Sequence, residues 1–279
     1  MKIVYFGSDV FLKVFRHLLF NHEILALYTY RKEEDYFCER NVAELARFHR
    51  IPVCYTRITE ERVMEYIDEM DCELFFVAEY CHKIPVPEDF RFRGVNIHAS
   101  LLPSGRSYYP IECAMERGLE ETGVTIHRLT PQIDRGGILA RRHFAIAPGE
   151  DSVDVYLKCA DAAYDMTLEV MSDFDRYWHE ARPQTETLPY WKRPEGGVMT
   201  LRHDMTTAEA KSVYRKYNNL TGVVVNGLLF NVNDFAAGLY KIGTGDEDII
   251  FVRESKILYG VADGHLRLCV SSAGRENMK

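Results

Sequence analysis

An asparagine and a histidine two residues apart form the first chemically useful pair in the sequence. Asn96 and His98 occur in the segment Gly94-Val-Asn-Ile-His-Ala-Ser-Leu-Leu-Pro103. Residues i and i+2 of a β-strand project from the same face, so both side chains would meet in one space. A carboxamide can stabilise a developing oxyanion while a neighbouring imidazole moves protons. The pair indicates a site for such chemistry, although a histidine at a strand end is also often structural.

A carboxylate further along the chain could serve that imidazole. Asp134 lies in Pro131-Gln-Ile-Asp-Arg-Gly-Gly137, a glycine loop between two expected strands. A carboxylate beside an imidazole favours its protonated form and fixes its tautomer. Aspartate is also an ordinary turn residue, so this loop alone leaves both interpretations open.

Other glycine and cysteine patterns exclude alternative chemistries. Gly7 is the only glycine where a dinucleotide fingerprint needs three, so nicotinamide binding is disfavoured. The seven cysteines are scattered, and no two have C-x-x-C spacing. We therefore expect no metal site, and a reduced compartment.

Strands and helices must alternate over the first 150 residues to position these side chains. The expected strands are 2–6, 23–30, 51–55, 74–78, 95–98, 122–129 and 138–146, and the expected helices are 8–21, 41–50, 60–70, 110–117 and 152–176. Such alternation predicts a mostly parallel, doubly wound α/β sheet, with an antiparallel edge after Thr122. Asn96 and His98 would then lie at the carboxyl end of their strand, where open α/β sheets bind ligands.

The composition changes beyond the long helix. We expect a catalytic domain over residues 1–182, a proline-containing linker over 183–194 and a small domain over 195–279. Thr207–Tyr217 reads as one short helix, capped by Thr206 with Glu209 three residues later. The rest reads as short strands separated by turns, which is typical of a small β-rich barrel.

The separate segments combine into one recognisable pattern. It consists of Asn96-Ile-His-Ala-Ser-Leu-Leu-Pro103, Arg106, Pro110-Ile, Gly118, Thr122-Gly-Val-Thr-Ile-His127, Asp134 and Gly137-Ile-Leu139. This pattern resembles the formyltransferases that use 10-formyltetrahydrofolate, and the resemblance covers residues 1 to about 180. It implies a Rossmann-like formyltransferase domain, followed by a small β-rich, OB-like domain.

The resemblance also implies a reaction and a co-substrate site. A formyl group would pass from 10-formyltetrahydrofolate to a primary amine. Asn96 and protonated His98 would stabilise the tetrahedral oxyanion, while Asp134 would support the imidazolium and order water. The folate would be held, largely by main-chain groups, at His82, Lys83, Ile84, Ser100, Leu101, Leu102, Pro103, Thr130, Pro131, Gln132 and Ile133.

One departure from the family pattern affects the acceptor side. The family usually has Arg-Gly after the Leu-Leu-Pro turn, but here Ser107 follows Arg106. Serine tolerates positive φ less well than glycine, so we expect the loop to take a different path. Arg106, Tyr108 and Tyr109 are the expected acceptor-binding residues.

Charge bears on which amine accepts the formyl group. The chain has a net charge of −8, the segment 31–40 has four acidic and three basic residues, and residues 189–279 have 12 basic and 10 acidic residues. These segments have too little positive charge to bind a phosphate backbone strongly. We therefore expect a nucleotide-linked amino sugar, ahead of methionyl-tRNA and of another small amine. An inactive folate-binding paralogue and a folate-deformylating hydrolase are alternatives of other classes.

The remaining expectations concern location and assembly. The N-terminus lacks the apolar stretch and cleavage site of a signal peptide, and no run approaches 18 apolar residues. We expect a cytoplasmic protein that has no membrane partner, and we leave a homodimer open.

Overall fold

The computed structural model describes residues 1–30, 41–192, 197–217, 221–225, 228–238, 251–253 and 256–272. Its contacts form two compact units. The first comprises Met1–Ile111, Glu120–Ala147 and Asp154–Lys192, and the second comprises Glu112–Leu119, Pro148–Val153 and Arg193–Lys279. Residues 183–192 of the expected linker therefore belong to the first unit. The domain boundaries expected from the sequence stay a prediction.

A seven-stranded sheet forms the centre of the first unit. Its strands are β1 (Lys2–Gly7), β2 (Glu23–Tyr28), β3 (Val53–Cys54), β4 (Leu74–Ala78), β5 (Gly94–His98), β6 (Glu121–Arg128) and β7 (Ile138–Ala145), in the order β3-β2-β1-β4-β5-β6-β7. The first five strands pair in parallel, whereas β6 and β7 pair antiparallel at the edge. The predicted sheet is confirmed, including its antiparallel edge.

Helices follow the strands where the hydrophobic spacing predicts them. They are the 3₁₀ turn η1 (Asp9–Phe11), α1 (Leu12–Asn21), α2 (Asn41–Phe48), α3 (Glu60–Asp68), α4 (Pro110–Glu116), α5 (Ser152–Ser172) and α6 (Phe174–His179). The single long helix expected over 152–176 is wrong at its end. Asp173 leaves the helical region, with φ −151° and ψ 59°, and divides it into α5 and α6.

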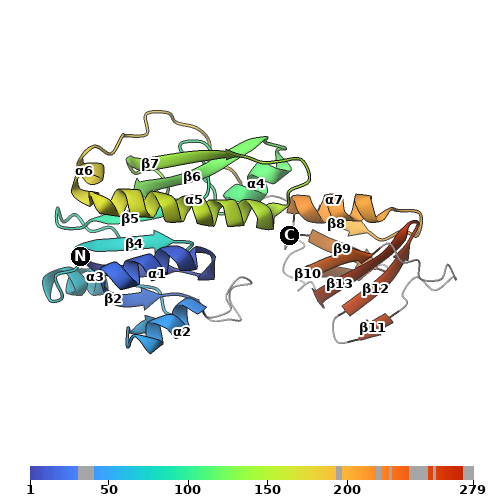
Figure 1. Cartoon of the computed structure of the whole chain (residues 1–279), viewed down its shortest axis with the longest axis horizontal. Coiled ribbons are helices and arrows are strands. Elements are labelled where there is room, and N and C mark those ends of the chain that lie inside the picture. Colours follow the sequence, from blue (N-terminus) through green and yellow to red (C-terminus); the bar gives the residue numbers. More distant parts are fainter. Residues whose placement is uncertain are drawn as a thin grey trace. The chain divides into compact units, whose positions relative to one another are not determined.

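Both faces of the sheet are covered, and the side chains of β1 show this because consecutive residues are buried on opposite sides. Tyr5 packs against Phe15 of α1, with ring centroids 4.9 Å apart. Phe6 faces the other way, into a core that includes Val63 and Tyr66 of α3. Helix α5 lies beside α1 (Figure 1), and Lys13 of α1 pairs with Asp161 of α5. The fold is therefore the doubly wound α/β arrangement that the sequence predicts.

The second unit is rich in β-structure. Its strands are β8 (Gly197–Thr200), β9 (Thr221–Val225), β10 (Leu228–Gly238), β11 (Phe251–Arg253), β12 (Lys256–Val261) and β13 (Gly264–Ser272), in the order β11-β12-β13-β10-β9-β8. Helix α7 (Thr207–Tyr217) begins with the expected capping box. Thr206 Oγ1 accepts from Glu209 N at 3.1 Å, and Glu209 Oε2 accepts from Thr206 N at 2.6 Å. No helix within the described ranges is long and apolar enough to cross a membrane.

Candidate active site

The site begins at the carboxyl end of β5, which delivers Asn96 and His98 two residues apart. In the antiparallel pairing of β5 with β6, Asn96 lies opposite His127 and His98 opposite Thr125. His98, Thr125 and His127 are all buried. Strand pairing therefore brings a second imidazole beside the predicted pair.

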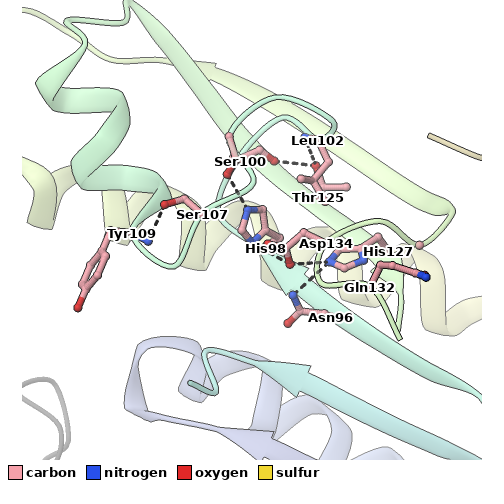
Figure 2. Close-up of polar contacts among 12 residues, drawn as sticks. Asn96, His98, Ser100, Leu102, Ser107, Tyr109, Thr125, His127, Gln132 and Asp134 are labelled. Atoms are coloured by element: carbon pink, nitrogen blue, oxygen red, sulfur yellow. Dashed lines mark hydrogen bonds and ion pairs between the residues drawn. The ribbon is translucent and has the colours of Figure 1, made fainter. Parts of the chain in front are cut away.

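Asp134 completes the cluster from the loop between β6 and β7. Its Oδ1 lies 3.7 Å from His98 Nδ1 and 3.7 Å from His127 Nε2 (Figure 2). The residue has a φ of 55°, in the left-handed region, and is 8% exposed. A separation of 3.7 Å is too long for a direct hydrogen bond, so the contacts are electrostatic. The structure thus brings Asn96, His98 and Asp134 together; their catalytic roles stay predictions.

Hydrogen bonding fixes the tautomer of His98. Its Nε2 lies 2.9 Å from the carbonyl oxygen of Gly105. A carbonyl only accepts, so Nε2 must carry a proton and donate it. Nδ1 is then the nitrogen that can gain or lose a proton, and it is the nitrogen that faces Asp134. This geometry suits an imidazole that exchanges one proton in the pocket.

His127 was not among the candidate residues, yet it orients Asn96. Its Nδ1 donates to the carbonyl oxygen of Arg128 at 2.9 Å, and its Nε2 lies 3.1 Å from Asn96 Nδ2. Burial lowers the pKa of His127 to about 4, against the raising effect of Asp134. A neutral ring with its proton on Nδ1 has an acceptor at Nε2, so Asn96 must present its amide nitrogen there. The sequence signal that could have revealed His127 was strand alternation, because residues 125 and 127 of one strand project from the same face.

A cavity of about 210 Å³ opens over these residues. Its lining includes Asn96, His98, Asp134 and the predicted folate residues His82, Lys83, Ile84, Thr130, Gln132 and Ile133. The other predicted folate residues, Ser100, Leu101, Leu102, Pro103 and Pro131, are not part of that lining. The turn after β5 is joined to β6, because Thr125 Oγ1 donates to Ser100 O at 2.7 Å and accepts from Leu102 N at 3.2 Å (Figure 2). Its folate contacts stay a prediction.

The expected acceptor residues separate into two groups. Tyr108 lines the cavity, as its neighbour Ser107 does, whereas the expected residues Arg106 and Tyr109 do not. Arg106 is 2% exposed, and its guanidinium donates to Glu186 O at 2.9 Å and to Leu188 O at 3.3 Å. The described residues with positive φ do not include Ser107, but they do include Gly105 at 78°. The loop therefore places its required glycine two residues earlier, and tolerates serine at 107.

A metal centre was not expected from the sequence. Within the described part of the chain, no three His, Cys, Asp or Glu side chains form a group that could hold a metal ion.

Comparisons with known proteins find formyltransferases. A family model described as "Formyl transferase" matches residues 38–171. The methionyl-tRNA formyltransferase of Parvibaculum lavamentivorans is 28% identical over 89% of this chain and 79% of its own length. That of Coxiella burnetii (strain RSA 331) is 29% identical over 63% of this chain and 59% of its own length.

Solved structures share the fold at lower identity. The N-formyltransferase of Helicobacter canadensis, in complex with folinic acid and dTDP-3-aminofucose, has a TM-score of 0.62 and 17% identity, covering 96% of this chain and 98% of its own. A variant of HypX from Aquifex aeolicus has a TM-score of 0.68 and 15% identity over 99% of this chain. The chain spans 46% of that HypX chain.

The family model and the relatives that match are those of formyltransferases, and they identify the chain as an enzyme of the one-carbon transferase class. Residues 38–171 are similar to the formyl transferase family.

Proposed function

We propose that the protein transfers the formyl group of 10-formyltetrahydrofolate to the primary amine of a nucleotide-linked amino sugar. The observation that carries the reaction is the convergence of Asn96, His98 and Asp134 on one cavity. Each group has a chemical role in such a transfer, and two of them come from one strand end.

The amine nitrogen attacks the formyl carbon, and the carbonyl oxygen becomes a tetrahedral oxyanion. Asn96 gives one amide hydrogen to His127 Nε2, which leaves the other for the oxyanion. Protonated His98 adds its positive charge, since its Nδ1 faces the cavity and Asp134. Protonated His98 donates its Nδ1 proton to the folate nitrogen N10 as the bond from N10 to the formyl carbon breaks. His98 Nδ1 then regains a proton from the amine nitrogen, through water held by Asp134.

Asp134 can act on His98 because its charge is not cancelled by the other imidazole. His127 is neutral near pH 7, since its pKa is lowered to about 4. The carboxylate therefore stabilises a cation on His98, where the oxyanion needs it. Asp134 orients and supports the imidazole in this proposal.

The folate is proposed to lie along the residues from 82–84 and 130–133 that line the cavity. HypX from Aquifex aeolicus has been solved in complex with tetrahydrofolic acid, and the Helicobacter canadensis protein with folinic acid. Tyr108 and Ser107 would then meet the acceptor at the cavity mouth.

A nucleotide-linked sugar is favoured as the acceptor by charge and by length. Residues 189–279 carry 12 basic and 10 acidic residues, which is little positive charge for a tRNA surface. The acidic segment 31–40 points the same way, but it lies outside the described residues. The Helicobacter canadensis protein bound to dTDP-3-aminofucose matches the chain over nearly all of both lengths.

Methionyl-tRNA is the second candidate acceptor, because the relatives of about 28% identity are methionyl-tRNA formyltransferases. A cytoplasmic location, and any homodimer, stay predictions under either acceptor.

One assay tests both proposals. Purified protein with 10-formyltetrahydrofolate is given methionyl-tRNA, a set of dTDP- and UDP-linked amino sugars, or no amine, and released tetrahydrofolate is followed. Release with an amino sugar supports the proposal, and release with methionyl-tRNA alone supports the second candidate. Equal release without amine indicates a hydrolase, and no release under any condition overturns formyl transfer.

A further inference from the structure

The segment between α6 and the end of the first unit has no helix and only one bridging pair with a strand. We call residues 182–191 the strap, and Figure 1 shows it as an extended trace beyond α6. Its first residue joins the start of β7, because Ile138 N donates to Arg182 O at 2.7 Å and Arg182 N donates to Ile138 O at 2.9 Å. The strap therefore begins where the Asp134 loop ends.

Gln184 of the strap holds the Asp134 loop from outside. Its Nε2 donates to the carbonyl oxygen of Asp134 at 2.9 Å and to that of Gly136 at 2.8 Å. One side-chain amide thus uses both hydrogens on two carbonyls of the same loop. On the other side the loop lies so close to Arg128 O that a Cβ at Gly136 would clash with it. The left-handed backbone of Asp134 is therefore fixed between β6 and the strap.

Further along, the strap holds the loop that carries the His98 partner. Arg106 donates to Glu186 O and Leu188 O, and Trp191 N donates to Arg106 O at 2.7 Å. The neighbouring carbonyl, that of Gly105, accepts from His98 Nε2 at 2.9 Å. The loop that contains Gly105 and Arg106 therefore orients the imidazole. The strap both accepts hydrogen bonds from this loop and donates one to it.

We propose that the strap is a positioning element for formyl transfer, in which Gln184 sets the Asp134 carboxylate and Arg106 sets the carbonyl that holds His98. The expected effect on the rate rests on the proposed function, whereas the hydrogen bonds of the strap do not depend on it. A shift of about 1 Å in a reacting group can cost about 10²-fold in rate, so such anchors have kinetic weight.

The direct test replaces Gln184. Gln184→Met keeps the length of the side chain and removes both donors, and Gln184→Ala removes the side chain. We expect kcat to fall by about 10- to 100-fold in both variants, with little change in the KM of the amine. Thr185→Ala, at an exposed side chain of the same strap, is the matched control and should keep wild-type kcat.

A pH profile separates positioning from loss of fold. His98 is faced by Asp134 and His127, and the same cavity is lined by Glu79, Cys81, His82, Lys83 and several tyrosines. Gln184 is uncharged, so replacing it alters none of these groups directly. If it positions Asp134, the shape of the kcat profile against pH changes in Gln184→Met, since the carboxylate no longer faces His98 in the same geometry. A purely structural role lowers the melting temperature and leaves the shape of that profile unchanged, which would overturn the proposal.

A readout without turnover keeps the inference separate from the proposed function. The ring resonances of His98, assigned with His98→Gln, are compared by NMR in the wild type and in Gln184→Met at one pH. Changed chemical shifts of this ring in the variant support the strap even where no amine is formylated. Identical chemical shifts, or an unchanged kcat in an active preparation, contradict it.

Arg106→Lys tests the second anchor. Lysine keeps the charge but cannot reach two carbonyls as a planar fork does. The strap predicts a lower kcat and an unchanged KM for the acceptor. A raised acceptor KM with normal kcat would instead make Arg106 a substrate contact and contradict this part of the proposal.

Discussion

At the scale of single residues, the site combines one mobile proton with several fixed ones. His98 Nε2 and His127 Nδ1 both donate to backbone carbonyls, at 2.9 Å each. Both remaining ring nitrogens face Asp134, but His127 Nε2 pairs with Asn96, and the pKa of His127 is lowered to about 4. His98 Nδ1 is therefore the ring nitrogen left to change its protonation in the proposed reaction.

Replacing any one of those three residues should slow the reaction without preventing folate binding. Asn96→Ala, His98→Ala and Asp134→Ala are each expected to reduce kcat by about 10² or more, because an oxyanion donor or a proton-transfer group is lost. Steady-state rates and folate fluorescence titrations measure the two effects. A variant that keeps nearly normal turnover removes its residue from the mechanism.

His127 makes a prediction about stability. Its pKa is lowered to about 4 by burial, from an ordinary value of 6.5. Below pH 6.5 the unfolded chain therefore binds a proton that the folded chain refuses, and stability is lost as the pH falls toward 4. The difference corresponds to about 3 kcal/mol at full effect.

Urea unfolding at pH 7 and pH 4.5 tests this linkage. His127→Gln should lose less stability between the two pH values than the wild type does. The matched control is His143→Gln, at an exposed histidine of β7. An equal pH dependence in wild type and His127→Gln would show that His127 is not the group responsible.

The sequence could predict the members of the site whose neighbours along the chain reveal them. Asn96 and His98 share one strand end, and Asp134 lies in a recognisable glycine loop. Gln184 could not be found in this way, because its partners are carbonyls of residues about 50 positions away. Every residue has a main-chain carbonyl, so the residue types along the sequence do not reveal which carbonyls accept a hydrogen bond from a side chain.

At the scale of elements, β6 does more than connect β5 to the edge strand β7. Thr125 Oγ1 donates to Ser100 O and accepts from Leu102 N, so it joins β6 to the turn that follows β5. The residue is fully buried. The folate contacts that the sequence predicts for this turn stay a prediction, and the structure adds that the turn is held by β6.

Thr125→Val should therefore destabilise the protein at almost constant volume. The loss of both hydrogen bonds leaves a buried N–H and a buried carbonyl without this partner, at a cost of about 1–3 kcal/mol. Urea unfolding measures it, with Thr187→Val at an exposed position as the control. A free energy of unfolding equal to that of the wild type would show that water replaces the hydroxyl.

The elements themselves followed from hydrophobic spacing, since nearly every expected strand and helix of the first unit is present. The exception, the break at Asp173, has a local cause. The carboxylate of Asp173 accepts from Arg176 Nε at 2.9 Å in the turn that follows, and the backbone there leaves the helix. Periodicity continues across such a break, because α6 keeps its apolar side chain Phe174 buried.

At the scale of the whole molecule, charge gives the two proposed acceptors different salt dependences. A tRNA acceptor that makes roughly 6–10 phosphate contacts would lose about 10³–10⁵ in affinity between about 50 and 200 mM salt. A sugar nucleotide offers one diphosphate, so its binding should weaken far less. With a net charge of −8, the chain favours the second case.

We therefore expect formylation of a nucleotide-linked amino sugar whose KM changes only a few-fold over that salt range. Initial rates at both salt concentrations, with methionyl-tRNA as the comparison acceptor, measure it. Efficient and salt-sensitive formylation of methionyl-tRNA would overturn the choice of acceptor and leave the site residues in place.

The position of the strap along the chain also sets an order of events during synthesis. The residues that supply the chemistry lie between 96 and 134, but Gln184 leaves the ribosome 50 residues after its partner Asp134. At translation rates of about 5–20 residues per second, this delay lasts roughly 3–10 s. By the end of that interval the nascent chain has all seven strands of the sheet and its imidazole, but not yet the anchors of its two active-site loops. Catalytic competence would thus arrive as the last step in the folding of the first unit.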